Sequence, residues 1–135
     1  MATDKTHVPI DHDVDIVAAR RRARELATQV GFSGSDLTII ATAISEVARN
    51  IVVYANRGEI VLSAVQRGNQ RGVLVVARDE GPGIPDIPRA MRDGFSTGKS
   101  LGLGLPGARR LMDEFEICSE VGKGTTITMR KWIRQ

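Results

Sequence analysis

The chain has 135 residues, of which 41% are hydrophobic and 26% are charged, a composition typical of one soluble globular domain. The net charge of +3, from 19 basic and 16 acidic side chains, is too small to require a polyanionic partner. Only 4% of the residues are aromatic, which argues against stacking platforms for single-stranded nucleic acid.

The sequence also bears on cellular location. No apolar run approaches the roughly 18 residues of a membrane span, and no signal peptide opens the chain, so we expect no membrane partner. The single cysteine, Cys118, excludes an internal disulfide, and its apolar surroundings predict an inert thiol in the core. We therefore expect one cytoplasmic domain over residues 1–135.

The first predicted helix is capped by Asp11 or Asp13 and runs to about Val30. A short edge strand at residues 7–10 precedes it, and Gly31 ends it. Its apolar residues make one buried stripe at helical spacing. The helix also carries four arginines: Arg20, Arg21, Arg22 and Arg24. These form either a solvated face or a docking surface, for which an acidic protein is favoured over nucleic acid.

The second predicted helix begins where Ser33 and Asp36 resemble a capping box, and it runs to about Tyr54. One of its faces is apolar. Polar residues recur every four positions beside that face: Thr42, Glu46 and Asn50. Side chains at this spacing project from the same side of a helix. A carboxylate and an amide one turn apart can therefore serve one hydrophilic pocket.

Two antiparallel hairpins are predicted from runs of β-branched residues bounded by turn residues. The first pairs residues 59–67 with residues 72–79, and the second pairs residues 116–121 with residues 125–133. The full order of elements is β-α-α-β-β-(α)-α-β-β. We therefore predict an α+β fold, a two-layer sandwich whose helices cover one face of a mixed, mostly antiparallel sheet.

A glycine- and proline-rich segment, residues 79–107, joins the two hairpins. It holds seven of the 14 glycines and four of the five prolines, and so long a connection in a compact domain is expected to bind or cover a ligand. Asp79 ends a predicted strand where this segment begins. Asp86 caps a short helix within it. A further helix begins at Pro106, which puts Gly102 and Gly104 at a helix N-terminus, a natural phosphate site.

Two phosphate-binding motifs are approximated in this segment, and both are rejected. Residues 102–107 match the letters of a dinucleotide fingerprint, but a polar loop precedes them where a strand is required. Residues 94–100 resemble a P-loop that is one residue short and has no preceding strand. Lys99 is nevertheless a candidate phosphate contact.

Four motifs occur in the order found in the GHKL ATPase superfamily, which includes gyrase, heat-shock protein 90, histidine kinases and MutL. Residues 46–50 resemble its N box, and residues 79–83 its D-x-G-x-G box. Residues 102–105 resemble its second glycine box, and residues 122–126 its closing G-x-G-T box. The resemblance covers about residues 35–134, and the predicted elements fit the Bergerat fold of this superfamily.

Within the superfamily, the chain is similar to the serine kinases and anti-sigma factors of bacterial partner switching, and most of all to the stressosome switch kinases. This resemblance implies a serine/threonine kinase that phosphorylates a STAS-domain scaffold protein and is then released to activate a downstream effector. A nucleotide-gated binding protein with little catalysis is the main alternative. An interaction domain that uses its arginine-rich helix and binds no nucleotide is the third.

The resemblance also implies ATP and Mg²⁺ as cofactors and a role for each site residue. Asp79 would accept a hydrogen bond from the adenine amino group, and Asn50 would coordinate Mg²⁺. Glu46 would be the general base toward the substrate hydroxyl. Other contacts would come from the remaining motif residues: Gly81 and Gly83 against the base, Thr125 near the adenine through water, and Gly102, Leu103, Gly104 and Lys99 at the phosphates.

Two departures from the family pattern affect the phosphate end of the predicted site. The paired phenylalanines usual in the lid are reduced to Phe95, so lid closure would depend on the protein partner. Pro106 follows the second glycine box, where many members of the family have a polar residue.

Overall fold

The computed structural model of the chain describes residues 5–92 and 104–134. The described strands form one antiparallel sheet in the order β1-β2-β3-β5-β4. Their bounds are β1 Thr6–Ile10, β2 Gly58–Arg67, β3 Gln70–Asp79, β4 Glu114–Glu120 and β5 Gly124–Trp132. The helices are α1 Asp13–Val30, α2 Ser35–Tyr54, α3 Ile87–Ala90 and α4 Gly104–Leu111.

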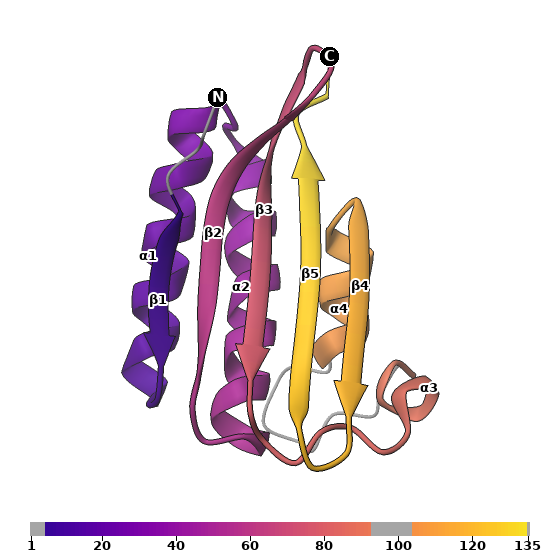
Figure 1. The fold of residues 1–135 in the computed structure, drawn as a ribbon. Coiled ribbons are helices and arrows are strands. Elements are labelled where there is room, and N and C mark those ends of the chain that lie inside the picture. Colours follow the sequence, from indigo (N-terminus) through magenta and orange to yellow (C-terminus); the bar gives the residue numbers. More distant parts are fainter. Residues whose placement is uncertain (1–4, 93–103, 135) are drawn as a thin grey trace.

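The three longer helices lie against one face of this sheet, which gives two layers (Figure 1). The predicted α+β sandwich is therefore confirmed. The sheet is simpler than predicted, because every pairing among the described strands is antiparallel and no mixed portion is found. Helices α1 and α4 pack on either side of α2, which makes α2 the central helix of its layer.

The core lies between α2 and the helix-facing side of the sheet. Ile44 and Val47 of α2, Leu62 of β2, Val75 of β3 and Met129 of β5 are all fully buried. Helix α2 is long and apolar enough to span a membrane by composition alone, but half of that stretch is buried inside the protein. Its apolar character follows from its place in the core, where helices and strands surround it.

The starts of both long helices differ from the prediction. The N-cap residue of α1 is His12, and the carboxylate of Asp15, at position N3, accepts hydrogen bonds from the backbone N–H groups of Asp11 at 2.8 Å and His12 at 3.0 Å. Capping by Asp11 or Asp13 was therefore wrong. The predicted capping box before α2 is also wrong, because Gly34 occupies the N-cap position with no side-chain cap. The Ser33 hydroxyl therefore lies one residue too early to cap the helix.

The hairpins and the end of α1 agree closely with the predictions from the sequence. Strands β2 and β3 pair from Gly58 opposite Asp79 to Arg67 opposite Gln70, so the first turn is shorter than predicted. Gly31 ends α1 with φ of 122°, a backbone conformation that favours glycine. The short helix α3 is capped as predicted, because the Arg89 N–H donates to the Asp86 carboxylate at 3.0 Å.

The spacing of Ala108, Leu111, Met112 and Phe115 predicts that the helix beginning at Pro106 extends to Phe115, but α4 begins at Gly104 and ends at Leu111. The Lys131 ammonium donates to the Leu111 carbonyl at 3.1 Å, and the Asp113 N–H donates to the Arg130 carbonyl at 3.0 Å. These bonds end the helix at Leu111 and start β4 early, so Phe115 belongs to a strand. Cys118 is exposed on β4, which corrects the prediction of a core thiol.

We expect Asp15→Ala to lower the melting temperature of the protein at pH 7. The backbone hydrogen bonds from Asp11, and next from His12, hold the pKa of the Asp15 carboxyl below its usual value. A lowered folded-state pKa gives stability that is complete above the unfolded value of about 3.9 and is lost as the pH falls through the folded value. Thermal unfolding from pH 7 to pH 2 should therefore show the difference between the two proteins shrinking below about pH 4.

Asp13→Ala is the matched control, since Asp13 lies in the same first turn and is not the cap. Its effect should be smaller and should come only from the helix dipole. A difference between Asp15→Ala and the native protein that stays constant across this pH range would contradict the role of the carboxylate.

Candidate nucleotide site

Polar residues from three neighbouring strands form a row at one end of the sheet. Asp79 on β3 lies opposite Thr125 on β5, and Thr125 lies opposite Ser119 on β4. Residues directly opposite one another in a sheet point to the same face. Two residues further along, Ala77 and Ile127 belong to the buried core, so the polar row lies at the rim of the core on the helix side.

The Asp79 carboxylate is held by the backbone. Its Oδ1 atom accepts hydrogen bonds from the N–H of Gly81 at 2.9 Å and from the N–H of Thr125 at 3.3 Å. Its Oδ2 atom has no hydrogen-bond partner among residues 5–92 and 104–134. One oxygen therefore fixes the side chain, and the other remains for a ligand that donates a hydrogen bond.

The two glycines of the D-x-G-x-G motif let the loop after β3 lie against its neighbours. A Cβ on Gly81 would come within 2.5 Å of the Ala55 Cβ and 2.8 Å of the Ala55 Cα, at the end of α2. Gly83 has φ of 79°, and a Cβ there would clash with the Glu120 carbonyl oxygen at the end of β4. Both positions therefore require glycine for close approach of backbone to backbone.

The turn between β4 and β5 closes the same corner of the molecule. The Gly122 N–H donates to the Pro82 carbonyl at 2.9 Å, which ties this turn to the loop after β3. Gly124 has φ of 117°, and a Cβ there would overlap the Asp79 carbonyl oxygen. The end of β3, the end of α2 and the β4–β5 turn therefore meet at one corner, at the lower edge of Figure 1.

Ser119 links these segments through its hydroxyl. The Ile84 N–H donates to Ser119 Oγ at 2.7 Å, and Ser119 Oγ donates to the Gly124 carbonyl at 3.2 Å. The Thr125 hydroxyl oxygen lies 2.8 Å from Ser119 Oγ. Thr125 itself is 5% exposed. A partly buried hydroxyl network of this kind fixes the geometry of the loops that it joins.

The polar stripe of α2 lies on a partly buried face of the helix. Glu46 is only 7% exposed, and its carboxylate lies 3.4 Å from the Arg49 guanidinium. Asn50 is half-buried, and in the described part of the chain its side chain has no hydrogen bond. The Thr42 hydroxyl bonds back to the Thr38 carbonyl at 2.8 Å, so it serves the helix itself. Because α2 ends against Gly81, its stripe leads toward the Asp79 loop.

The phosphate end of the predicted site is described only in part. Gly104 is the first residue of α4 and has φ of 51°, and α4 packs beside α2. Lys99, Gly102 and Leu103 lie outside the described residues, so their roles stay predictions. Within the described ranges, no group of three His, Cys, Asp or Glu side chains could hold a metal ion. A neutral amide oxygen on Asn50 suits Mg²⁺ that is also held by phosphates and water.

Two residues of this corner were missed by the sequence analysis. Ser119 pairs with Thr125 across the closing turn, and its signal was the symmetric placement of the two hydroxyls around residues 120–124. Ala55 had no signal, because its contact with Gly81 depends on where α2 ends in space. The structure thus brings Asp79, Gly81, Gly83 and Thr125 together.

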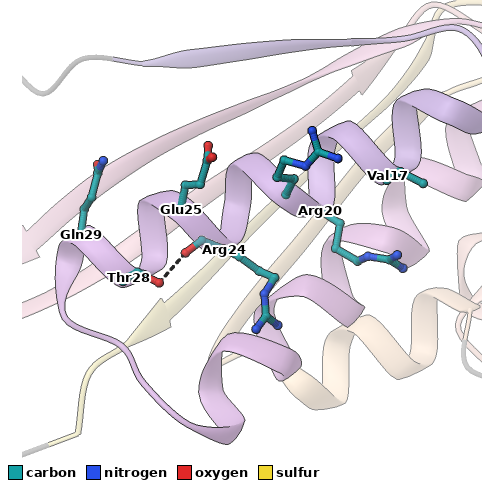
Figure 2. A pocket seen from close by; sticks show the side chains of 7 residues that line it. Val17, Arg20, Arg24, Glu25, Thr28 and Gln29 are labelled. Atoms are coloured by element: carbon teal, nitrogen blue, oxygen red, sulfur yellow. Dashed lines mark hydrogen bonds between the residues drawn. The ribbon is translucent and has the colours of Figure 1, made fainter.

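A shallow groove lies on the exposed side of α1, away from this corner. It is lined by α1 residues, most of which Figure 2 labels: Val17, Arg20, Arg21, Arg24, Glu25, Thr28 and Gln29. Helix α2 stands between α1 and α4, so the groove is separate from the candidate nucleotide site. The four arginines of α1 are exposed on the protein surface, and a docking role for them is a prediction.

Comparison with known proteins identifies the family to which the chain belongs. The model of the histidine kinase-like ATPase domain matches residues 9–131, so the chain belongs to this family. It is 50% identical over 131 residues to the serine/threonine-protein kinase RsbT of Bacillus subtilis (strain 168), which covers 97% of this chain and 98% of that protein. It is also 36% identical over 121 residues to the anti-sigma F factor of Thermoanaerobacter sp. (strain X514), at 85% and 83% coverage.

Among solved structures, the fold resembles the mycobacterial sensor histidine kinase MprB. The TM-score is 0.56 at 20% identity, over 94% of this chain and 97% of that one. This likeness concerns the fold alone. Together with the family match, it confirms the predicted GHKL-type fold, and the kinase relative confirms the predicted class of ATP-dependent serine/threonine kinase.

We expect Gly81→Ala to weaken ATP binding and to lower stability by about 1–3 kcal/mol, the usual cost of overpacking. The added methyl would meet Ala55 and push the loop away, which would also remove the Gly81 N–H from the Asp79 carboxylate. Calorimetric titration with ATP and thermal unfolding measure the two effects. The exposed neighbour gives the control, Glu80→Ala, and equal ATP affinity for both variants would refute the close contact.

Proposed function

We propose that this chain is a serine/threonine kinase of a bacterial partner-switching pathway, which phosphorylates a STAS-domain scaffold protein and then activates a downstream effector. The observation that carries the proposal is the Asp79 carboxylate, whose Oδ1 is held by two backbone N–H groups and whose Oδ2 accepts no hydrogen bond within the described residues. The 50% identity to a serine/threonine kinase supports it. We also propose that it acts as a single cytoplasmic domain over residues 1–135, with neither nucleic acid nor membrane as a partner.

Adenine recognition would take place at the rim of the sheet. The free Asp79 Oδ2 would accept a hydrogen bond from the adenine amino group, which donates two. Gly81 and Gly83 would let the ring lie against the backbone, and the Thr125 hydroxyl would act near the base through water. The close packing of this corner supports the assignment, because a preorganised site loses less entropy when its ligand binds.

Phosphate transfer would take place beside α2. Glu46 would take the proton from the seryl or threonyl hydroxyl as its oxygen forms a bond to the γ-phosphorus and the bond to the leaving ADP breaks. Burial of the Glu46 carboxylate supports this role. A buried charge lowers the stability of the folded protein, and such residues are common at functional sites. The contact with Arg49 would hold the carboxylate in one orientation.

Asn50 would hold Mg²⁺ through its amide oxygen, one helical turn from Glu46. When bound, Mg²⁺ would neutralise charge on the transferred phosphoryl group. The backbone of Gly102, Leu103 and Gly104 and the Lys99 ammonium would contact the phosphates. Of these, only Gly104 lies within the described residues, where it begins a helix whose dipole favours anions.

A second candidate function is a nucleotide-gated binding protein with little catalysis. The likeness to anti-sigma F factors over 85% of this chain favours it. Such a protein needs Asp79 and Asn50 for the nucleotide but has no use for a general base at Glu46. Variants of these residues therefore separate the two functions.

We expect Asp79→Asn to weaken ATP binding by about 10- to 100-fold while the protein stays folded, because a charged hydrogen bond contributes about 1.5–3 kcal/mol. The variant keeps the shape of the side chain and removes its charge. Isothermal titration calorimetry measures the affinity, and Glu80→Gln, a change to the exposed carboxylate next to it, should bind as the native protein does. Unchanged ATP affinity in Asp79→Asn would rule out its contact with adenine.

We expect Glu46→Ala and the near-isosteric Glu46→Gln to bind ATP but to transfer phosphate about 10²- to 10⁴-fold more slowly, the usual contribution of a general base. The assay follows label from ATP·Mg²⁺ to a STAS-domain protein encoded beside this chain. Asp36→Asn, at the far end of α2, is the control and should keep full activity. Undiminished transfer by both Glu46 variants would place the base elsewhere, and ATP binding with no transfer by the native protein would favour the binding protein.

A further inference from the structure

The hydrogen bonds at Ser119 determine which way the Thr125 hydroxyl points. Ser119 Oγ lies 3.2 Å from the Gly124 carbonyl, which can only accept, so the single Ser119 proton is used there. The arrangement that satisfies both contacts at once has the Thr125 hydroxyl donating to Ser119 Oγ, 2.8 Å from Thr125 Oγ1. Thr125 is therefore the donor within the pair.

The oxygen of Ser119 is fully occupied in this arrangement. It accepts from the Ile84 N–H at 2.7 Å and from the Thr125 hydroxyl, and it donates to Gly124. A hydroxyl offers one donor and two acceptor positions, so all three are in use. The Thr125 oxygen, in contrast, keeps acceptor capacity and faces the rim of the core on the same side as Asp79.

We propose that Ser119 is a positioning residue of the nucleotide site. It holds the Thr125 hydroxyl as a hydrogen-bond acceptor toward the adenine end of ATP, and it anchors the loop after β3 at Ile84. It touches no reacting atom and acts through these two neighbours. The inference rests on the proposed function, because it assumes that the Asp79 and Thr125 row binds adenine.

The location of Ser119 supports this role over a purely structural one. Its two loop contacts, Ile84 and Gly124, lie on opposite sides of the corner where the D-x-G-x-G loop meets the closing turn. Ile84, which donates one of these hydrogen bonds, is the residue after Gly83, and the backbone of Gly83 lies close to the Glu120 carbonyl. Loss of the Ser119 hydroxyl would therefore release the Thr125 proton and free the loop that forms one wall of the base site.

The test measures ATP affinity by calorimetry in a double-mutant cycle of Ser119→Ala and Thr125→Val. We expect Ser119→Ala to weaken ATP binding about tenfold in the native background, and about threefold or less in the Thr125→Val background, where no hydroxyl remains to be oriented. In the phosphate-transfer assay the variant should raise KM for ATP and leave kcat at saturating ATP near the native value.

The control is Cys118→Ala. Cys118 is the residue before Ser119 on β4, and its exposed side chain faces away from the site. This variant should bind ATP as the native protein does. Should Ser119→Ala fold poorly in thermal unfolding, Ser119→Cys keeps nearly the same volume with only weak hydrogen bonding, and it should show the same loss.

Either of two outcomes would overturn the inference. One is an ATP affinity for Ser119→Ala equal to that of Cys118→Ala. The other is an equal fold-loss of ATP affinity for Ser119→Ala with and without the Thr125 hydroxyl. That result would mean that Ser119 only connects the two loops and does not orient Thr125. A native protein that binds no ATP would instead refute the proposed function, so the two failures can be told apart.

Discussion

The backbone grip on the Asp79 carboxylate is the constraint on which the candidate site depends. Two N–H groups, one from the following loop and one from β5, hold the same carboxylate oxygen. This is possible only because Gly81 and Gly124 allow their backbones to approach without Cβ atoms. These hydrogen bonds therefore link strand pairing and loop conformation at Oδ1 and orient Oδ2, the oxygen assigned to the ligand. A ligand that reaches the other oxygen meets a side chain whose position is already determined.

The same corner also depends on the position of α2. Helix α2 is apolar because the sheet, α1 and α4 surround it, yet its last turn packs against Gly81 in the Asp79 loop. One rigid element therefore carries the candidate catalytic stripe at one position and supports the base site at its end. The candidate adenine contact at Asp79 and the candidate catalytic residues of α2 are therefore joined by a helix that packs in the core.

Local patterns in the sequence were enough to predict the hairpins, the two-layer fold, the α2 stripe and the place of Asp79 at a strand end. The errors have two causes, contacts with distant residues and local backbone geometry that the sequence leaves ambiguous. Helix α4 ends at Leu111 because Lys131, 20 residues away, binds its last carbonyl. Several similar carboxylates lie at the start of α1, and Asp15 is the one that bonds back to the backbone N–H groups of Asp11 and His12. Cys118 is exposed because the alternation of β4 depends on where that strand begins.

The burial of Glu46 has a consequence for descent with modification. A carboxylate held at 7% exposure and balanced by one nearby guanidinium is a burden on the folded state, because an apolar side chain would suit that position better. On the proposal that Glu46 is the general base, selection for catalysis retains this carboxylate. A lineage released from that selection could replace it with an apolar side chain and gain stability, while the Asp79 corner at the C-terminal end of α2 persists.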